Sequence, residues 1–368
     1  MASTAGGPPA GVALTSLLEL PDRIADLRGA PRSRIDRLFD VRRSLGITEP
    51  PPELEPWLAR TFGSVDAVRH QALVKVTNLA TLEATLFAPL RNRRPADVSE
   101  AATDLAATLA DTGADPFCTP EVSTPAEPIG RVRGRRMVSG ANAAMADAHH
   151  AVLVFEVHDP LALDADLVAD LLYTGRRWAE TSHAADPDAR HYLLVWNCLW
   201  RAGGSIVHGH AQALLGTGPP YARQARFNRD AERYRHEHGA GLLDELVAAH
   251  RDLGLARSEG TATICAHLTP LKERELVVVG APGGDERDPD FSSAVARALL
   301  ALRDRLGVRS FNLGLWRDPL GADGGAPPVA RIVDRGDLAA RPSDIGAMEL
   351  YGTPIIGADP YDVIAALD

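Results

Sequence analysis

The chain contains few cysteines, almost no lysine and no long apolar run. Three cysteines in 368 residues, Cys118, Cys198 and Cys265, are too few and too scattered for a disulfide framework, so we expect a reducing, cytoplasmic setting. No stretch approaches the roughly 20 apolar residues that a membrane helix needs. The start of the chain lacks the basic residues and apolar run of a signal peptide. We therefore expect no membrane partner.

The charge of the chain limits its partners. The formal net charge is -10 at pH 7, and only two of the 39 basic residues are lysines, Lys75 and Lys272. Binding to a nucleic acid polymer depends on a cationic surface, so we expect no such partner. A small anionic ligand needs only a local group of arginines. The hydrophobic content of 45% is that of an ordinary globular protein with a large core.

The chain divides into three predicted parts. Residues 1–70 form a tail and a helical extension, and residues 71–220 and 221–368 each contain one copy of an internal repeat. The helices expected in the extension cover residues 17–27, 34–45 and 54–61. In both copies the expected order is strand, helix, strand, strand. The first copy covers residues 150–158, 164–178, 192–197 and 205–214, and the second 275–279, 291–306, 310–315 and 329–333.

The most informative motif is His208-Gly209-His210-Ala211-Gln212. Alternate residues of a strand share a face, so we expect His208, His210 and Gln212 to project together from the strand over 205–214. Close histidine pairs also arise by chance. One such pair, at 236 and 238, lies among charged residues of a helix that we expect to be solvated.

The two copies differ in their histidines. The last histidine of the chain is His267, so the second copy has Val329-Ala330-Arg331-Ile332-Val333 where the first has its histidine pair. We therefore expect the catalytic residues to lie in the first copy alone. A neutral imidazole attacks activated phosphorus readily, provided that its far nitrogen is held protonated by a hydrogen bond.

The motif resembles that of the galactose-1-phosphate uridylyltransferase branch of the histidine triad superfamily. In that branch the pattern is His-Pro-His-x-Gln, and Gln212 stands where the simpler triad hydrolases have a third histidine. The resemblance covers about residues 80–335. It implies an α+β fold of duplicated half-barrel antiparallel sheets with flanking helices, beside the N-terminal helical extension. The sequence departs from the pattern at Gly209, which replaces the proline and is expected to loosen the backbone around the nucleophile.

The resemblance also implies roles for single residues. His210 would attack the α-phosphorus of a nucleotide, Gln212 would bond a phosphoryl oxygen, and Ser205 would contact phosphate. Substrate-binding residues would be Asn197, Gly203, Gly204, Arg91 and Arg94. From local sequence alone, the arginines of the turn at 91–95 are equally consistent with a solvated turn.

A structural zinc is implied as well. In the family, zinc is held by Cys-x-x-Cys, a histidine after the first long strand, and the first histidine of the motif. The matching residues here are Asp115, Cys118, His158 and His208, with a carboxylate in place of the first cysteine. In the alternative interpretation, Asp115 caps a turn, Cys118 is a core residue and His158 ends a strand.

Three functions remain open at this stage. The first is a nucleotidylyltransferase that moves a nucleoside monophosphate from a nucleotide sugar to a sugar 1-phosphate through a covalent His210 intermediate. The second is a phosphorylase that acts on a nucleotide sugar, another nucleoside diphosphate derivative or a dinucleoside polyphosphate, with inorganic phosphate as the acceptor. The third is a non-catalytic nucleotide-binding protein. The family resemblance also implies a homodimer.

Overall fold

The computed structural model describes residues 16–93, 104–322, 325–340 and 345–368. The strands are β1 (Phe39–Ile47), β2 (His70–Asn78), β3 (Ala84–Phe87), β4 (Met137–Ala141), β5 (His149–Phe155), β6 (His191–Cys198), β7 (His210–Gly216), β8 (Ala256–Glu259), β9 (Ala262–Ala266), β10 (Leu276–Val279), β11 (Phe311–Trp316), β12 (Val329–Asp334) and β13 (Ile355–Ile356). The α-helices are α1 (Leu20–Asp26), α2 (Gly29–Leu38), α3 (Glu55–Phe62), α4 (Val65–Arg69), α5 (Leu105–Asp111), α6 (Pro120–Ser123), α7 (Ala165–Ala185), α8 (Ala222–His238), α9 (Leu242–Asp252), α10 (Pro289–Asp304), α11 (Ala347–Leu350) and α12 (Pro360–Ala365). Short 3₁₀ turns are η1 (Leu17–Glu19), η2 (Pro52–Leu54), η3 (Pro89–Arg93), η4 (Pro116–Cys118) and η5 (Trp200–Ala202).

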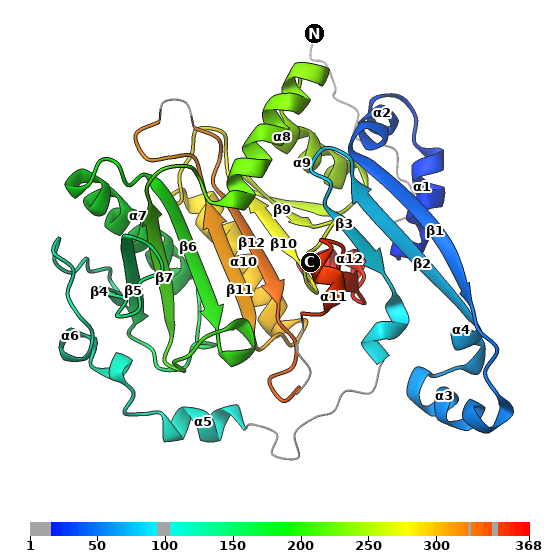
Figure 1. The fold of residues 1–368 in the computed structure, drawn as a ribbon, viewed down its shortest axis with the longest axis horizontal. Helices are drawn as coiled ribbons and strands as arrows, with labels where there is room; N and C mark the ends of the chain where they lie inside the picture. Colours follow the sequence, from blue (N-terminus) through cyan, green and yellow to red (C-terminus); the bar gives the residue numbers. More distant parts are fainter. Residues whose placement is uncertain (1–15, 94–103, 323–324, 341–344) are drawn as a thin grey trace, which may run out of the picture.

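Two sheets organise these elements (Figure 1). A nine-stranded antiparallel sheet has the order β4-β5-β7-β6-β11-β12-β10-β9-β8, and a four-stranded sheet has the order β1-β2-β3-β13. The two copies of the repeat, β5-α7-β6-β7 and β10-α10-β11-β12, stand on either side of the β6–β11 pair in the large sheet. The α+β fold with duplicated antiparallel sheets is thus confirmed.

The centre of the duplication is a pair of asparagines. Asn197 of β6 lies opposite Asn312 of β11, and the Asn312 Nδ2 donates to the Asn197 Oδ1 at 2.7 Å. Asn197 and Asn312 occupy equivalent positions in the two copies. The internal symmetry axis therefore passes between them. In β12, Val333 lies opposite Asn312. The β6–β7 pairing ends at Val195 and Gln212, and its continuation by two residues brings His210 opposite Asn197.

The large sheet has one covered face and one open face. Helices α7 and α10 lie behind it in Figure 1 and pack on the covered face, where Trp196 and Phe311 are buried with their ring centroids 5.0 Å apart. Side chains alternate along a strand, so the neighbours of these core residues face the opposite side, which we call the open face. His210 and Gln212 project from it, because Ala211 and Ala213, the two neighbours of Gln212, belong to the core on the covered face.

The N-terminal extension differs from its expected form. Residues 34–45 were expected to be helical, but α2 ends at Leu38, and β1 pairs along its whole length with β2. Its backbone hydrogen bonds come from a strand that begins more than 20 residues later, and local helical periodicity carries no trace of such a partner. The expected boundary at residue 70 falls at the first residue of β2.

No helix in the described ranges is both long enough and apolar enough to cross a membrane.

Candidate active site

His210 opens β7 on the open face of the first copy. Its side chain is almost wholly buried, and the ring of Phe117 packs against it edge to face with centroids 4.9 Å apart. Phe117 also contacts Val152, Val154 and Ile206, which form a small apolar cluster separate from the main core. Burial lowers the pKa of His210, an effect that the hydrogen bond to the His208 backbone opposes. The imidazole is therefore favoured in its neutral form.

The tautomer of His210 follows from one hydrogen bond. Its Nδ1 lies 2.8 Å from the carbonyl oxygen of His208, and a carbonyl only accepts, so Nδ1 carries the proton. The Nε2 of the neutral ring then has a free lone pair. A buried, neutral imidazole with an unprotonated Nε2 is the state that a nucleophile requires.

Gln212 is held by His150 from β5. The backbone N–H of Ala146 donates to the His150 Nδ1 at 3.0 Å, so the proton of that ring is on Nε2. Nε2 lies 2.8 Å from the Gln212 Oε1 and donates to it. The Asn142 Nδ2 lies 3.2 Å from the same nitrogen, but both atoms are donors and share no proton. The Gln212 amide thus accepts through its oxygen and keeps its NH₂ group for another partner.

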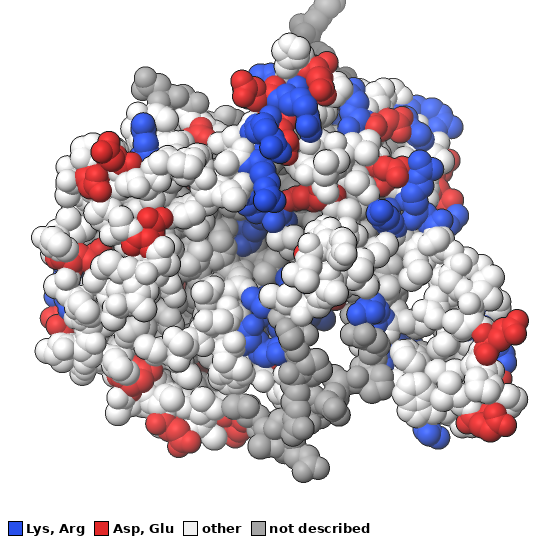
Figure 2. Space-filling view, in the orientation of Figure 1, with Lys and Arg blue, Asp and Glu red and all other residues white. Residues whose placement is uncertain are grey.

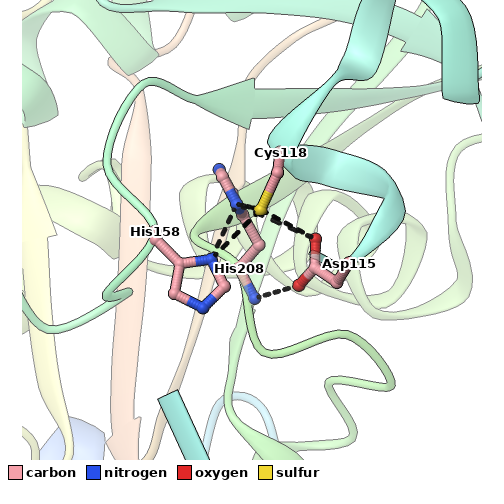
Figure 3. Close-up of side chains that lie close together, drawn as sticks. All are labelled: Asp115, Cys118, His158 and His208. Atoms are coloured by element: carbon pink, nitrogen blue, oxygen red, sulfur yellow. Dashed lines mark hydrogen bonds and ion pairs between the residues drawn. The ribbon is translucent and has the colours of Figure 1, made fainter. Parts of the chain in front are cut away.

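Four predicted metal ligands converge beside this strand. Asp115, Cys118, His158 and His208 each place one ligand atom within 4.8 Å of the others. Figure 3 shows that Cys118 of η4 and Asp115, which precedes η4, face the imidazoles of the two histidines. The Cys118 Sγ is 3.6 Å from the His158 Nδ1 and 3.5 Å from the His208 Nδ1.

The protonation of the two imidazoles suits a cation. The His208 Nε2 lies 2.9 Å from the Phe155 carbonyl oxygen, and the His158 Nε2 lies 3.1 Å from the Leu109 carbonyl oxygen. Both Nε2 atoms must therefore be protonated, which leaves two bare Nδ1 lone pairs only 3.0 Å apart. Two acceptors at that distance repel each other unless a cation lies between them. With the Cys118 thiolate, they form a donor set that zinc prefers.

Asp115 caps η4 and also lies beside the other three candidate metal ligands. Its Oδ1 accepts from the Phe117 backbone N–H at 2.8 Å and caps η4, as the alternative interpretation proposed. The same Oδ1 is 3.8 Å from the Cys118 Sγ and 3.8 Å from the His208 Nδ1. The carboxylate also accepts from the His208 backbone N–H at 3.1 Å. It joins η4 to the loop before β7 with or without an ion.

The loop between β6 and β7 holds the remaining predicted residues of the motif. Gly203 has φ +88°, which favours glycine, and a Cβ on Gly204 would lie 2.7 Å from the Asn197 carbonyl oxygen. Asn312 donates to the Ala202 carbonyl oxygen at 2.9 Å and so ties this loop to the second copy. Ser205 lies exposed in the loop.

The strand was expected to begin at residue 205, but β7 begins at His210. Consequently His208 does not share the strand face of His210 and Gln212. It lies in the loop, and its ring turns toward Cys118 and His158. The loop is shaped by its two glycines and by Asp115, a partner 93 residues earlier in the chain. The two histidines of the motif therefore belong to adjacent but distinct sites.

Gly209 does not loosen the backbone as expected. Its N–H donates to the His158 carbonyl oxygen at 3.0 Å, and its carbonyl oxygen accepts from the Phe155 N–H at 2.9 Å. A Cβ at this position would lie 2.9 Å from the Phe155 Cδ2 and 3.0 Å from the Val157 carbonyl oxygen. The close approach of β5 and the loop that follows it leaves no room for a side chain.

The predicted phosphate-binding turn lies at a separate cavity. Arg91 belongs to η3 and lines a cavity of about 420 Å³ together with Arg201, Lys272 and Arg335. Arg201 follows β6 in η5, so this cavity borders the same loop that leads to His210. Arg94 lies outside the described residues.

Two residues of this site were missed or left undecided in the sequence. Phe117 had no signal of its own beyond lying between Asp115 and Cys118. His149 and His150 open β5 as a pair, and alternation along the strand could have placed only one of them on the open face. That residue is His150, whereas the His149 Nε2 lies 2.9 Å from the Asp186 carboxylate.

Restoring the family's proline at Gly209 should damage the protein. Gly209→Pro removes the hydrogen bond to His158 and introduces a ring where not even a Cβ fits, so we expect the free energy of unfolding to fall by at least about 3 kcal/mol. Gly314→Ala is the control, since a Cβ there meets nothing within 4 Å. Urea denaturation measures both. A Gly209→Pro variant as stable as the wild type would contradict the described packing.

Comparison with solved structures places this geometry in a known fold. No protein-family model and no curated protein matches the chain. An ADP-glucose phosphorylase from Arabidopsis thaliana with bound ADP-glucose superposes with a TM-score of 0.61 at 17% identity, covering 79% of this chain and 97% of that one. A GalT-like protein from the same plant gives 0.56 at 18% identity over 68% and 90%. A uridylyltransferase gives 0.53 at 16% identity over 79% and 96%. The chain therefore has the fold that these three structures share.

Proposed function

We propose that this protein is a nucleotidyltransferase that works through a covalent nucleotidyl-His210 intermediate. The observation that carries the proposal is the Nδ1 hydrogen bond of a buried His210 to the His208 carbonyl oxygen, which leaves Nε2 as a free base on the open face. The shared fold with a uridylyltransferase and an ADP-glucose phosphorylase supports nucleotides as the substrate class.

The first half-reaction forms one bond and breaks one. The His210 Nε2 attacks the α-phosphorus of a nucleotide sugar, and the bond from that phosphorus to the bridging oxygen breaks. Sugar 1-phosphate leaves with the electron pair, and the nucleoside monophosphate remains on the imidazole. In the second half-reaction a phosphate oxygen of the acceptor attacks the same phosphorus and releases neutral His210.

Gln212 and His150 act together in this proposal. The His150 Nε2–H holds the Gln212 Oε1, so the amide NH₂ donates to a phosphoryl oxygen in the intermediate. His150 is a positioning residue, because it acts through Gln212. Ser205, Asn197 and the glycine pair shape the loop that receives the phosphates, while Arg91 supplies a guanidinium at the adjoining cavity.

The metal cluster has a structural role. We assign zinc to Cys118, His158 and His208, with Asp115 as the fourth ligand. When bound, zinc would compensate the two facing imidazole lone pairs and fix η4 to the loop before β7. Phe117 lies between the ligands of η4, so its ring would stay against His210.

The acceptor distinguishes two versions of this function. The first transfers the nucleotide to a sugar 1-phosphate. The second uses inorganic phosphate and is favoured by the shape similarity to an ADP-glucose phosphorylase at a TM-score of 0.61. Both versions use the same intermediate. They differ in the molecule that enters after the first product leaves.

The intermediate can be trapped directly. Incubation with a nucleotide sugar should add one nucleoside monophosphate to the chain by mass spectrometry, and His210→Asn should abolish the adduct and reduce transfer at least about a thousandfold. His236→Asn is the matched control, because His236 is exposed on α8 and should keep both. An adduct that persists in His210→Asn would refute the assignment. No adduct with any common nucleotide sugar would favour a non-catalytic binding protein.

Zinc content is a separate test. Purified protein should hold about one zinc per chain by elemental mass spectrometry, and His158→Ala or Cys118→Ser should lower this below a half. His238→Ala, on the solvated helix α8, should leave it unchanged. Chelation should lower the melting temperature of the wild type more than that of His158→Ala. Metal-free protein with wild-type stability and no zinc uptake would exclude the site.

Radiolabelled phosphate separates the two acceptors. If the protein is a phosphorylase, the adduct on His210 will react with labelled phosphate and release a labelled nucleoside diphosphate. If it is a sugar 1-phosphate transferase, the label will stay in phosphate, and an added sugar 1-phosphate will discharge the adduct instead. Our primary proposal, transfer to a sugar 1-phosphate, fails if only phosphate discharges it.

A further inference from the structure

A second cavity lies on the open face of the second copy, away from His210. Its volume is about 260 Å³. The floor consists of open-face residues of β9, β10 and β12, among them Cys265, Val277 and Val329, and helices α8 and α9 with the β2–β3 turn close over it. Figure 2 shows basic side chains in a row along α8, beside the hollow in the middle of the molecule. This face corresponds through the internal duplication to the one that carries His210.

Most charges at this cavity are already neutralised. Burial would raise the pKa of Glu83, but the neighbouring His267, Arg331 and Arg223 together lower it to about 2. The Glu83 carboxylate is thus ionised and balances the arginines that approach it. Asp230, the other acid of the lining, pairs with Arg229 at 3.3 Å and with a second arginine of α8.

Two groups of the lining have no partner among the described residues. Arg226 of α8 makes no hydrogen bond or ion pair there. Asn78 is 1% exposed, and its Oδ1 accepts from the backbone N–H groups of Ala80 and Thr81 at 2.9 and 3.1 Å. Its Nδ2 is buried without an acceptor. This amide has almost no accessible surface, so a ligand in the cavity cannot reach it. Arg226 is exposed at the rim and is the cation that stays available to a ligand.

The rest of the wall is mainly apolar. Phe227 of α8 and Trp316 of β11 provide aromatic rings, and the valines of the floor provide further apolar surface. A ligand that matches this cavity therefore has an apolar, planar body and an anionic group. A nucleoside monophosphate has both features, with its base against the valines and its phosphate at the rim beside the guanidinium of Arg226.

We propose that this cavity is a second, non-catalytic nucleotide site that binds a nucleoside monophosphate. Among the described residues of the second copy, the position that corresponds to His210 carries no nucleophile. Val333 stands at the position of His210, and both nitrogens of the His250 ring are engaged, with the Leu246 carbonyl oxygen and the Leu268 N–H. Binding at this site is therefore expected to be reversible.

Binding stoichiometry tests this proposal. Equilibrium dialysis with AMP, UMP, GMP and CMP should show at least one of them bound to a site that survives in His210→Asn. Arg226→Glu should weaken this binding at least tenfold, whereas Arg235→Glu, on an exposed position of the same helix, should not. Val277→Phe fills the cavity without changing its charge and should also abolish the binding. Formation of the His210 adduct should be the same in the Arg226→Glu and Arg235→Glu variants.

Each other outcome is informative. Unchanged binding in both Arg226→Glu and Val277→Phe would overturn the proposal, as would the absence of any nucleoside monophosphate bound to His210→Asn. Inorganic phosphate that binds as tightly as the nucleotides would show a plain anion site and overturn it too. Because the assay needs no turnover, failure of the proposed catalytic function would leave this result readable on its own.

Discussion

The hydrogen bond from the His210 Nδ1 to the His208 carbonyl oxygen determines how the rest of the site works. It fixes the tautomer of the buried imidazole and leaves Nε2 free toward the open face. The same residue that provides the carbonyl turns its own ring toward Cys118 and His158. Orientation of the proposed nucleophile and placement of the four candidate metal ligands therefore depend on one stretch of backbone. Gly209 makes this possible, because only a residue without Cβ lets that backbone lie against β5.

Duplication explains why one half of the sheet can specialise. The two copies meet at the Asn197–Asn312 pair, and Asn312 of the second copy also holds the loop that leads to His208. The second copy thus supports the first through direct hydrogen bonds. On the same side of the sheet as His210, the second copy packs against α8 and α9 and forms a mainly apolar cavity with them.

The sequence was sufficient to predict the elements whose patterns are local. The strands and helices of both copies follow from alternation and helical periodicity. The four candidate metal ligands, which the structure brings together, follow from the family resemblance. Features that depend on distant partners were not predictable. Strand β1 forms its backbone hydrogen bonds with β2, and the loop before β7 is held by the hydrogen bond to Asp115. Gly209 is required because the end of β5 lies against its backbone. The bond from His150 to Gln212 likewise joins residues 62 positions apart.

The tautomer of His210 is the most direct test of the account, because it requires neither substrate nor metal assay. Long-range ¹H–¹⁵N correlation spectra of protein labelled at histidine, with His210→Asn to assign the signal, report the protonation of each ring nitrogen. The account predicts that near pH 7 His210 is neutral, with the proton on Nδ1 and none on Nε2. A proton on Nε2, in either the other tautomer or the imidazolium, would contradict it.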